Sequence, residues 1–189
     1  MATANPNKIK EINEILENTD FNVISMLETG YEEEIEETGL TLEENALIKA
    51  RVLHQELGED VFSEDTGLEV DALNGLPGVK TARFAGEDKD PRKNMSLLLE
   101  KLKGIDDRSA QFRTCIALIL GNKEYLFEGK VRGSISNELQ GEGGFGYDPI
   151  FIPEGFDRTF GQLSSKIKNE ISHRKRAMDQ LVEFLEKNQ

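Results

Sequence analysis

The segment that decides the fold covers residues 62–78 and has the sequence FSEDTGLEVDALNGLPG. Its start, with Val61 and Phe62, is typical of the apolar end of a short strand, and the carboxylates Glu64 and Asp65 follow before a Thr-Gly turn. An open α/β sheet binds its ligands outside the carboxyl ends of its strands, so this pair is a candidate for holding a divalent cation against a phosphate. The alternative for an isolated Glu-Asp pair is a solvated turn.

Composition narrows the class of protein. The chain has 189 residues and a net charge of −13, from 23 basic and 36 acidic side chains. A nucleic-acid-binding surface needs a basic footprint, so this charge argues against such a partner but allows a free nucleotide. The single cysteine, Cys115, excludes an intrachain disulfide and a cysteine-based metal site. Neither a long apolar stretch nor a signal peptide is apparent, which predicts a cytoplasmic protein with no membrane contact. The length predicts a single domain over residues 1–189, alone or with a second lobe.

The N-terminal segment predicts a helix that begins near an anion site. Asn5 suits the N-cap position and Pro6 the first helical position. Free backbone N–H groups at a helix N-terminus attract anions, and Lys8 adds a positive charge in the first turns. A capped surface helix without a ligand is the alternative.

A second acidic segment, EETGLTLEENA, covers residues 36–46. Thr41 and Glu44 have the spacing of a capping box, and the helix that they begin is expected to end at Gly58. Lys49 lies off the apolar stripe of this helix, where a solvated lysine is the ordinary interpretation. Farther along, the sequence pattern predicts two strands, at residues 110–120 and 125–131, that form a hairpin around Gly121. We interpret this hairpin as scaffold.

A glycine-rich segment, GEGGFGYDPIF, covers residues 141–151. It lacks the Gly-Lys-Ser/Thr sequence of a P-loop, so its aromatic rings are more informative than its glycines. If Phe145 and Tyr147 are exposed, a ring face can stack on a purine. The alternative is that both rings belong to the core of a strand.

The last segment of interest, KNEISHRKR, covers residues 168–176. Ser172 is a plausible N-cap for a final helix, whose apolar stripe consists of Ala177, Leu181, Phe184 and Leu185. A His-Arg pair in the basic first turn of such a helix normally lies on the surface.

Taken together and in this order, the segments at residues 3–8, 36–46, 63–84, 141–151 and 168–174 resemble the signatures of the inosine triphosphate pyrophosphatase family. The resemblance covers nearly the whole chain. It implies an α/β fold in which a long mixed β-sheet forms two lobes flanked by helices, with a nucleotide cleft between them. It also implies Mg²⁺-dependent hydrolysis of purine nucleoside triphosphates such as ITP, dITP and XTP to the monophosphate and pyrophosphate, by a homodimer.

The resemblance assigns roles to individual residues. Glu37 and Asp65 would hold the metal, Asp65 would also be the general base, and Glu64 would support the metal or the water. The oxo group at C6 of hypoxanthine or xanthine accepts hydrogen bonds, which suits lysine, histidine and arginine donors in the base pocket. The residues implied to bind substrate are, for the triphosphate, Thr3, Asn5, Lys8, Lys49 and Thr66, and, for the base, Phe145, Gly146, Tyr147, Asp148, Lys168, His173 and Arg174.

Two departures from the family pattern lead to further expectations. The buried strand that precedes the Thr3 segment in the family is missing, so either the start is clipped or another segment takes its place, and stability should suffer from unpaired backbone groups. Glu64 stands where the family more often has Asp, which can shift the carboxylate enough to change the rate. The rival functions are nucleotide binding without turnover and hydrolysis of another modified nucleotide, such as a pyrimidine triphosphate.

Overall fold

A computed structural model describes residues 1–3, 5–17, 19–31 and 33–188. The chain divides into two compact units. Unit 1 comprises Met1–Asp65, Thr114–Gly129 and His173–Gln189, and unit 2 comprises Thr66–Arg113 and Lys130–Ser172. Each unit is therefore built from segments that are far apart in the sequence.

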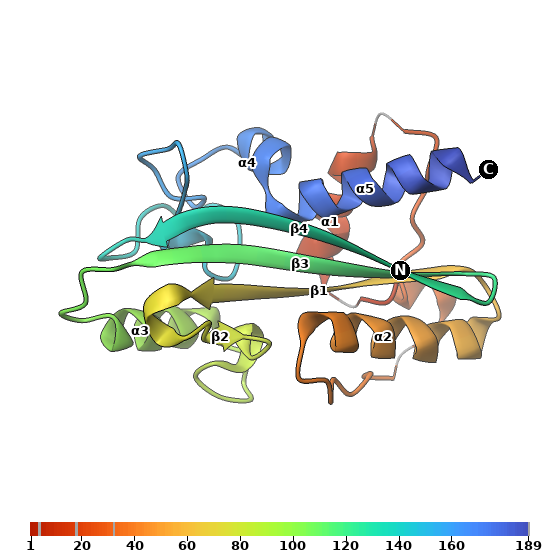
Figure 1. The fold of residues 1–189 in the computed structure, drawn as a ribbon, viewed down its shortest axis with the longest axis horizontal. Coiled ribbons are helices and arrows are strands. Elements are labelled where there is room, and N and C mark those ends of the chain that lie inside the picture. The colour runs from red at the N-terminus through yellow and green to blue at the C-terminus, as the bar shows by residue number, and fades with distance from the viewer. Residues whose placement is uncertain (4, 18, 32, 189) are drawn as a thin grey trace. The chain divides into compact units, whose positions relative to one another are not determined.

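One sheet of five strands supplies the scaffold (Figure 1), with the strand order β2-β1-β3-β4-β5. The pairings of β1 with β2 and of β4 with β5 are antiparallel, with Leu68 opposite Gly78 and Ile135 opposite Phe151. The expected α/β fold, with one long sheet flanked by helices, is confirmed. The strands are β1 (Val61–Val70), β2 (Pro77–Gly78), β3 (Ser109–Leu120), β4 (Lys123–Ile135) and β5 (Phe151–Pro153).

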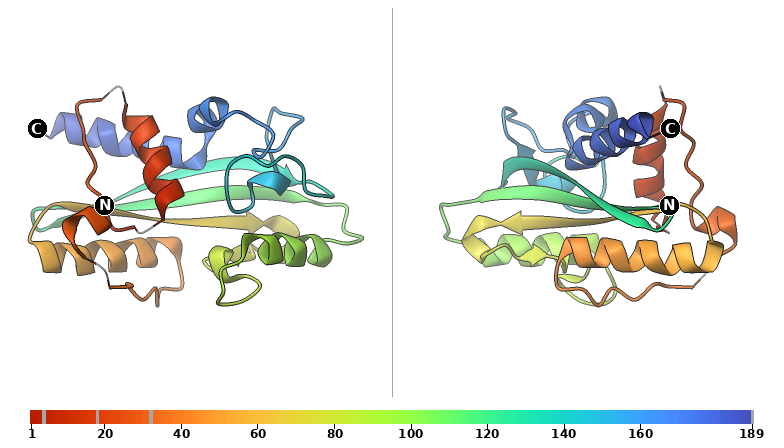
Figure 2. Two further views of the ribbon diagram at one scale, coloured as in Figure 1. Left: turned by 180° about the vertical axis from the view of Figure 1, so that it is seen from behind. Right: turned by 45° about the vertical axis from the view of Figure 1, so that its right-hand side comes forward.

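Unit 1 contains helices on both faces of its part of the sheet. Helices α1 (Pro6–Leu16) and α5 (His173–Lys187) lie on one face and α2 (Leu42–Leu57) lies on the other (Figure 2). Under α1 and α5 the core is aliphatic, with Ile12 and Leu181 buried against strand β3. On the other face the alanines of α2 allow close packing against β3. The residues of that second cluster are Ala46, Ala50, Ala117 and Ile119.

Unit 2 contains helices α3 (Pro91–Lys101) and α4 (Ser165–Ile171) and the short strands β2 and β5. Its core includes three aromatic rings in mutual contact, Phe112, Phe151 and Phe160, with Phe112 and Phe151 edge to face at 4.7 Å between centroids. Aromatic pairs in this geometry contribute stability beyond that of the apolar area that they bury. The described part of the chain also contains four short 3₁₀ helices: Leu27–Thr29, Asp71–Leu73, Thr81–Arg83 and Asp148–Ile150.

The helix starts agree with the capping signals in the sequence. The Asn5 side chain accepts hydrogen bonds from the backbone N–H groups of Asn7 and Lys8 at the start of α1. Thr41 and Glu44 form the predicted capping box of α2, which ends at Gly58 in the left-handed region at φ 67°. Side-chain oxygens thus satisfy backbone donors that would otherwise have no partner.

The first residues occupy a position beside β1. The backbone N–H of Ala2 donates to the carbonyl of Phe62 at 2.9 Å, and the side chains of Met1 and Ala2 are buried. The two residues that precede Thr3 therefore pack beside β1. Residues 21–25, a possible strand by their alternation, are irregular; there, the carbonyl of Ile24 accepts a hydrogen bond from the N-terminal amine.

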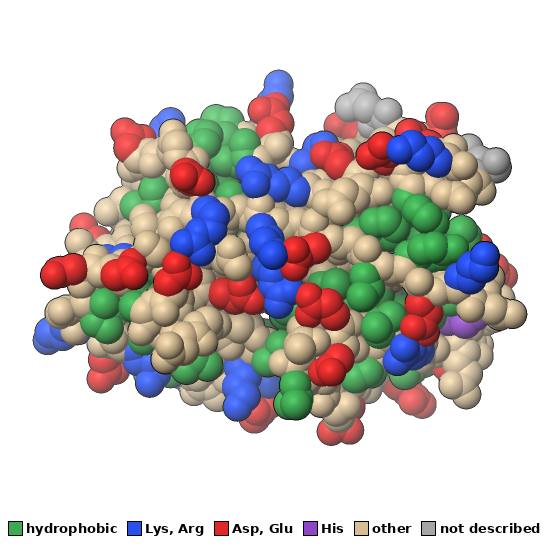
Figure 3. All heavy atoms as spheres, viewed as in Figure 1, with side chains coloured by type: hydrophobic (Ala, Val, Ile, Leu, Met, Phe, Trp, Pro, Cys, Tyr) green, Lys and Arg blue, Asp and Glu red, His purple; other side chains and the backbone are tan. Residues whose placement is uncertain are grey.

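The surface carries charges of both signs. On the face seen in Figure 3, acidic and basic side chains are interspersed among apolar groups. Exposed pairs include Arg51 with Glu124, joined by two hydrogen bonds of 2.7 Å. None of the helices in the described part of the chain is long and apolar enough to cross a membrane.

Candidate functional site

The two adjacent carboxylates lie inside a strand. Strand β1 continues from Val61 to Val70, so the expectation of a short strand that ends at Phe62, followed by a Thr-Gly turn, is wrong. Glu64 and Asp65 are both buried, and consecutive strand residues point to opposite faces of a sheet. Polar residues are tolerated in the middle of this strand because cations from helices on both faces pair with them.

Glu64 faces helices α1 and α5. Arg174 in the first turn of α5 donates two hydrogen bonds to its carboxylate, both of 2.8 Å, and Lys8 of α1 lies 3.2 Å from it. Arg174 also donates to Glu11, and its side chain is 1% exposed. Burial alone would raise the pKa of Glu64, but the two cations outweigh burial and hold it well below the usual range. Glu64, Arg174, Lys8 and Glu11 therefore form a buried cluster of ion pairs.

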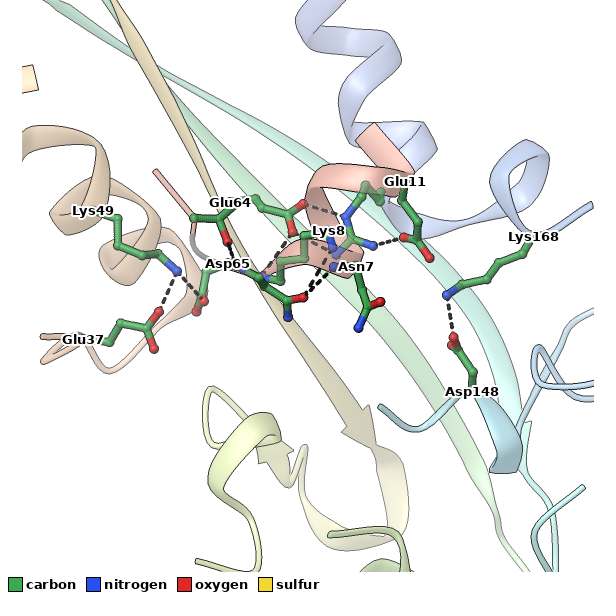
Figure 4. Close-up of polar contacts among 12 residues, drawn as sticks. Asn7, Lys8, Glu11, Glu37, Lys49, Glu64, Asp65, Asp148 and Lys168 are labelled. Atoms are coloured by element: carbon green, nitrogen blue, oxygen red, sulfur yellow. Dashed lines mark hydrogen bonds and ion pairs between the residues drawn. The ribbon is translucent and has the colours of Figure 1, made fainter. Parts of the chain in front are cut away.

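Asp65 faces helix α2 (Figure 4). The ammonium group of Lys49 lies between two carboxylates, 2.7 Å from Oε1 of Glu37 and 2.9 Å from Oδ1 of Asp65. Burial raises the pKa of Asp65, and this effect exceeds the opposing effect of Lys49. For Lys49, burial would lower the pKa, but Asp65 and Glu37 together raise it. The lysine is thus charged and Asp65 is the more basic of the two adjacent strand carboxylates.

The loop that carries Glu37 is fixed by the first turn of α2. The backbone N–H of Gly39 donates to Oδ1 of the buried Asn45 at 2.7 Å, and that of Leu40 donates to Glu44 at 2.6 Å. A Cβ atom at Gly39 would lie only 2.6 Å from Oδ1 of Asn45, so the approach requires glycine. The local signature of residues 36–46 therefore aims Glu37 at Lys49.

Unit 2 holds a second polar cluster. Asp148 accepts hydrogen bonds from the backbone N–H of Phe145 at 2.7 Å and from Nζ of Lys168 at 2.5 Å. The same Nζ lies 4.6 Å from the centre of the Phe145 ring, as a cation–π contact. Gly144 has φ 70°, and a Cβ there would overlap the carboxylate of Asp148. The glycines thus let the loop turn tightly around Asp148.

The aromatic rings of this loop differ in exposure. Phe145 and Gly146 are half-buried, whereas Tyr147 is 3% exposed and its hydroxyl donates to the carbonyl of Thr81 at 3.0 Å. Burial raises the pKa of Tyr147 above its ordinary value. Of the two alternatives for these rings, burial in the core holds for Tyr147, which packs in the core of unit 2.

The C-terminal motif is also divided. The final helix, α5, begins directly after Ser172 as expected, but a further helix, α4, precedes it, so Ser172 lies between the two. Lys168 belongs to unit 2, and the buried residues His173 and Arg174 belong to unit 1. Of the predicted site residues, unit 1 holds Thr3, Asn5, Lys8, Glu37, Lys49, Glu64, Asp65, His173 and Arg174, and unit 2 holds Thr66, Phe145, Gly146, Tyr147, Asp148 and Lys168.

Sequence reasoning missed Glu11 as a member of the site. Its carboxylate is buried beside the apolar stripe that contains Ile12 and Leu16. A charged residue next to such a stripe was an available signal, since a buried carboxylate requires a partner. The partner, Arg174, is 163 positions away and could not be identified from the sequence.

The donor set of Glu37 and Asp65 fits a hard divalent cation. A positively charged group, the ammonium of Lys49, already bridges their oxygens. No cluster of three or more His, Cys, Asp or Glu side chains with metal-binding geometry occurs in residues 1–3, 5–17, 19–31 and 33–188. Mg²⁺ is commonly held by one or two carboxylates together with substrate phosphates, so two carboxylates suffice.

Comparisons with known proteins agree with this picture. The chain is 50% identical over 188 residues to a dITP/XTP pyrophosphatase of Caldanaerobacter subterraneus subsp. tengcongensis, covering 98% of this chain and 94% of the relative. It is 48% identical over 189 residues to a dITP/XTP pyrophosphatase of Bacillus subtilis, covering 98% and 96%.

Solved structures match as well. The Staphylococcus aureus Ham1 protein has a TM-score of 0.90 and 42% identity, covering 100% of this chain and 97% of that one. A HAM1 protein from Coxiella burnetii also has a TM-score of 0.90, with 38% identity, covering 98% and 96%. The family model described as the Ham1 family matches residues 1–184. The resemblance inferred from the motifs is confirmed, and the chain belongs to the Ham1 family.

Proposed function

We propose that this protein hydrolyses dITP, XTP and ITP to the nucleoside monophosphate and pyrophosphate. The observation that carries the proposal is the convergence of Glu37 and Asp65 on one buried ammonium group, in the unit that also contains Lys8. This arrangement offers oxygen donors for a cation and two lysines for phosphate charge. Relatives named dITP/XTP pyrophosphatase, which match nearly the whole chain, support the choice of substrate.

Mg²⁺ is the proposed cofactor, with Glu37 and Asp65 as its protein ligands. When bound, it would neutralise phosphate charge and polarise the phosphoryl oxygens. Asp65 accepts a proton from the attacking water as the new P–O bond forms. The anhydride bond between the α- and β-phosphates breaks, and pyrophosphate leaves. The raised pKa of Asp65 suits a general base better than the lowered pKa of Glu64 does.

Glu64 has a different proposed role. Its carboxylate is bound by Arg174 and Lys8 on the face of the strand opposite to Asp65. We therefore assign Glu64 to holding Lys8 in place, rather than to contact with the attacking water. The glutamate side chain reaches both cations.

The remaining proposed contacts concern the triphosphate and the base. Thr3, Asn5 and Thr66 would donate to phosphate oxygens alongside Lys8 and Lys49. The exposed part of the Phe145 ring would stack on the purine, near Gly146, Tyr147 and Asp148. Lys168 and His173 would donate to the 6-oxo group, and Arg174 would have to release one of its carboxylates to do the same. Adenine presents an amino group at that position and would leave these donors without acceptors.

Two further statements belong to the same proposal. The resemblance implies a homodimer, which light scattering coupled to size-exclusion chromatography tests directly. The lack of an apparent apolar stretch or signal peptide in the sequence predicts a cytoplasmic location, which fractionation of cells tests.

The decisive experiment is pyrophosphate release from ITP, dITP, XTP, GTP, ATP and CTP, with and without Mg²⁺. Metal-dependent release confined mainly to the first three supports both the reaction and the base assignment. Release from all six keeps the phosphate chemistry but contradicts the roles of Lys168, His173 and Arg174. Absence of release from folded protein favours nucleotide binding without turnover.

A further inference from the structure

Lys49 lies between the two carboxylates that are the proposed metal ligands. Its ammonium group lies 2.7 Å from Glu37 and 2.9 Å from Asp65, and the side chain is 10% exposed. The two carboxylates come from different segments, a loop and a strand. The ammonium group of Lys49 therefore bridges the two carboxylates.

The lysine and a divalent cation compete for this position. An ammonium group only donates hydrogen bonds, so it contributes no lone pair to a metal. Both cations seek the same carboxylate oxygens, and like charges within a few ångströms of each other repel strongly in a buried site. A divalent cation held by the two carboxylates would therefore require the ammonium group to leave them.

Glu64, the carboxylate next to Asp65, holds its cations in a way that does not allow such an exchange. Glu64 is bound through two hydrogen bonds by Arg174, whose planar fork matches a carboxylate, and through a third contact by Lys8. Lys49 makes one contact with each carboxylate through a compact ammonium on a flexible stem. Of these two buried clusters, the one around Lys49 is built for exchange.

We propose that Lys49 is a placeholder for the metal, which holds Glu37 and Asp65 together and is released to the triphosphate when Mg²⁺ binds. The inference rests on the proposed function and adds a coupling mechanism to it. Before the metal binds, the carboxylates sequester Lys49, so the nucleotide gains little from it. After the metal binds, the same lysine is free to bind phosphate. Metal and nucleotide thus bind with positive cooperativity through one side chain.

The test uses Lys49→Met and two equilibrium measurements at pH 8. The first is Mn²⁺ binding without nucleotide, followed by electron paramagnetic resonance. We expect the variant to bind Mn²⁺ more tightly, by about 5- to 150-fold, which is the usual range of a coupling factor. The second is binding of a non-hydrolysable α,β-imido analogue of ITP, with and without Mn²⁺. We expect the variant to lose affinity in that range with Mn²⁺ and less than about twofold without it.

Two outcomes would overturn the inference. Unchanged or weaker Mn²⁺ binding in Lys49→Met means that the lysine does not compete with the metal. Equal loss of analogue affinity with and without Mn²⁺ means that Lys49 is a phosphate ligand at all times. Lys10→Met is the matched control, because it removes the same charge from an exposed side chain of unit 1 and should change neither measurement.

Controls also separate this inference from the proposed function. Far-UV circular dichroism checks that Lys49→Met is folded, and Lys49→Gln repeats both measurements with a polar side chain. A wild-type protein that releases no pyrophosphate contradicts the proposed function, yet its Mn²⁺ affinity can still be compared with that of the variants. An active wild-type protein with unaltered Mn²⁺ binding in both variants contradicts the placeholder role alone.

Discussion

The substitution Glu64→Gln should unfold the protein far more readily than its conservative chemistry suggests. It removes the charge of a fully buried carboxylate that pairs with Arg174 and Lys8. Loss of one partner from a buried ion pair costs about 3–5 kcal/mol, because an uncompensated charge remains in the interior. Glu11 still pairs with Arg174, so we expect the lower end, about 3 kcal/mol. For a chain of this size that corresponds to a fall in Tm of about 6–12 °C.

The chain offers a matched control in the same unit. Glu124 also accepts two hydrogen bonds from one arginine, Arg51, at 2.7 Å each, but both side chains are exposed. Glu124→Gln should therefore cost less than about 1 kcal/mol. Urea unfolding, followed by far-UV circular dichroism because the chain has no tryptophan, measures both variants. Equal losses in the two variants would refute the argument that burial makes the Glu64 cluster structural.

The difference in stability between the wild type and Glu64→Gln should change with pH in a defined direction. Arg174 and Lys8 hold the pKa of Glu64 below its ordinary value of 4.5. A carboxylate with a lowered pKa in the folded state contributes stability above its unfolded pKa and loses it as the pH falls toward the folded value. The difference between wild type and Glu64→Gln should stay constant from pH 8 down to about 4.5 and shrink only below it. A difference that disappears by pH 6 would contradict this assignment.

Three further predictions concern individual residues. Asp65→Asn should lower turnover by about 10²- to 10⁴-fold while leaving analogue binding measurable, and near-normal pyrophosphate release would remove Asp65 as the base. Gly129→Ala should lower the free energy of unfolding, measured in urea, by about 1–3 kcal/mol, because a Cβ would lie 2.0 Å from the carbonyl oxygen of His173. An unchanged urea midpoint would contradict this packing. Phe145→Ala should weaken ITP-analogue binding by about 1–3 kcal/mol but leave inorganic triphosphate binding unchanged, and equal weakening of both would exclude a stacking role.

Local signals in the sequence predicted the parts of the fold that local contacts determine. Asn5 and Pro6 begin α1, and the reciprocal hydrogen bonds of Thr41 and Glu44 begin α2. The hairpin of β3 and β4 turns at Gly121, which has φ 57°. Each of these features depends on residues only a few positions apart, so their spacing contains the information.

The errors arise where a distant partner decides the outcome. Glu64 stays inside β1 because Arg174, 110 positions away, neutralises it. Tyr147 is buried because the carbonyl of Thr81, 66 positions away, accepts its hydroxyl hydrogen. From the sequence, the Glu-Asp pair indicated a turn in the first case, and the exposure of the ring was left open in the second. The sequence thus identified the polar segments, but not which of their residues would be paired and buried.

The two neighbouring carboxylates show how one strand separates stability from chemistry. Because Glu64 and Asp65 point to opposite faces of β1, each meets a different set of helices and a different kind of cation. Glu64 gains a rigid arginine fork that lowers its pKa, and its loss should cost stability. Asp65 shares one flexible lysine and has a raised pKa, so its charge is costly to the fold and useful to a reaction. It follows that Glu64→Gln should unfold readily while Asp65→Asn should stay folded and inactive, although the two residues are adjacent in the chain.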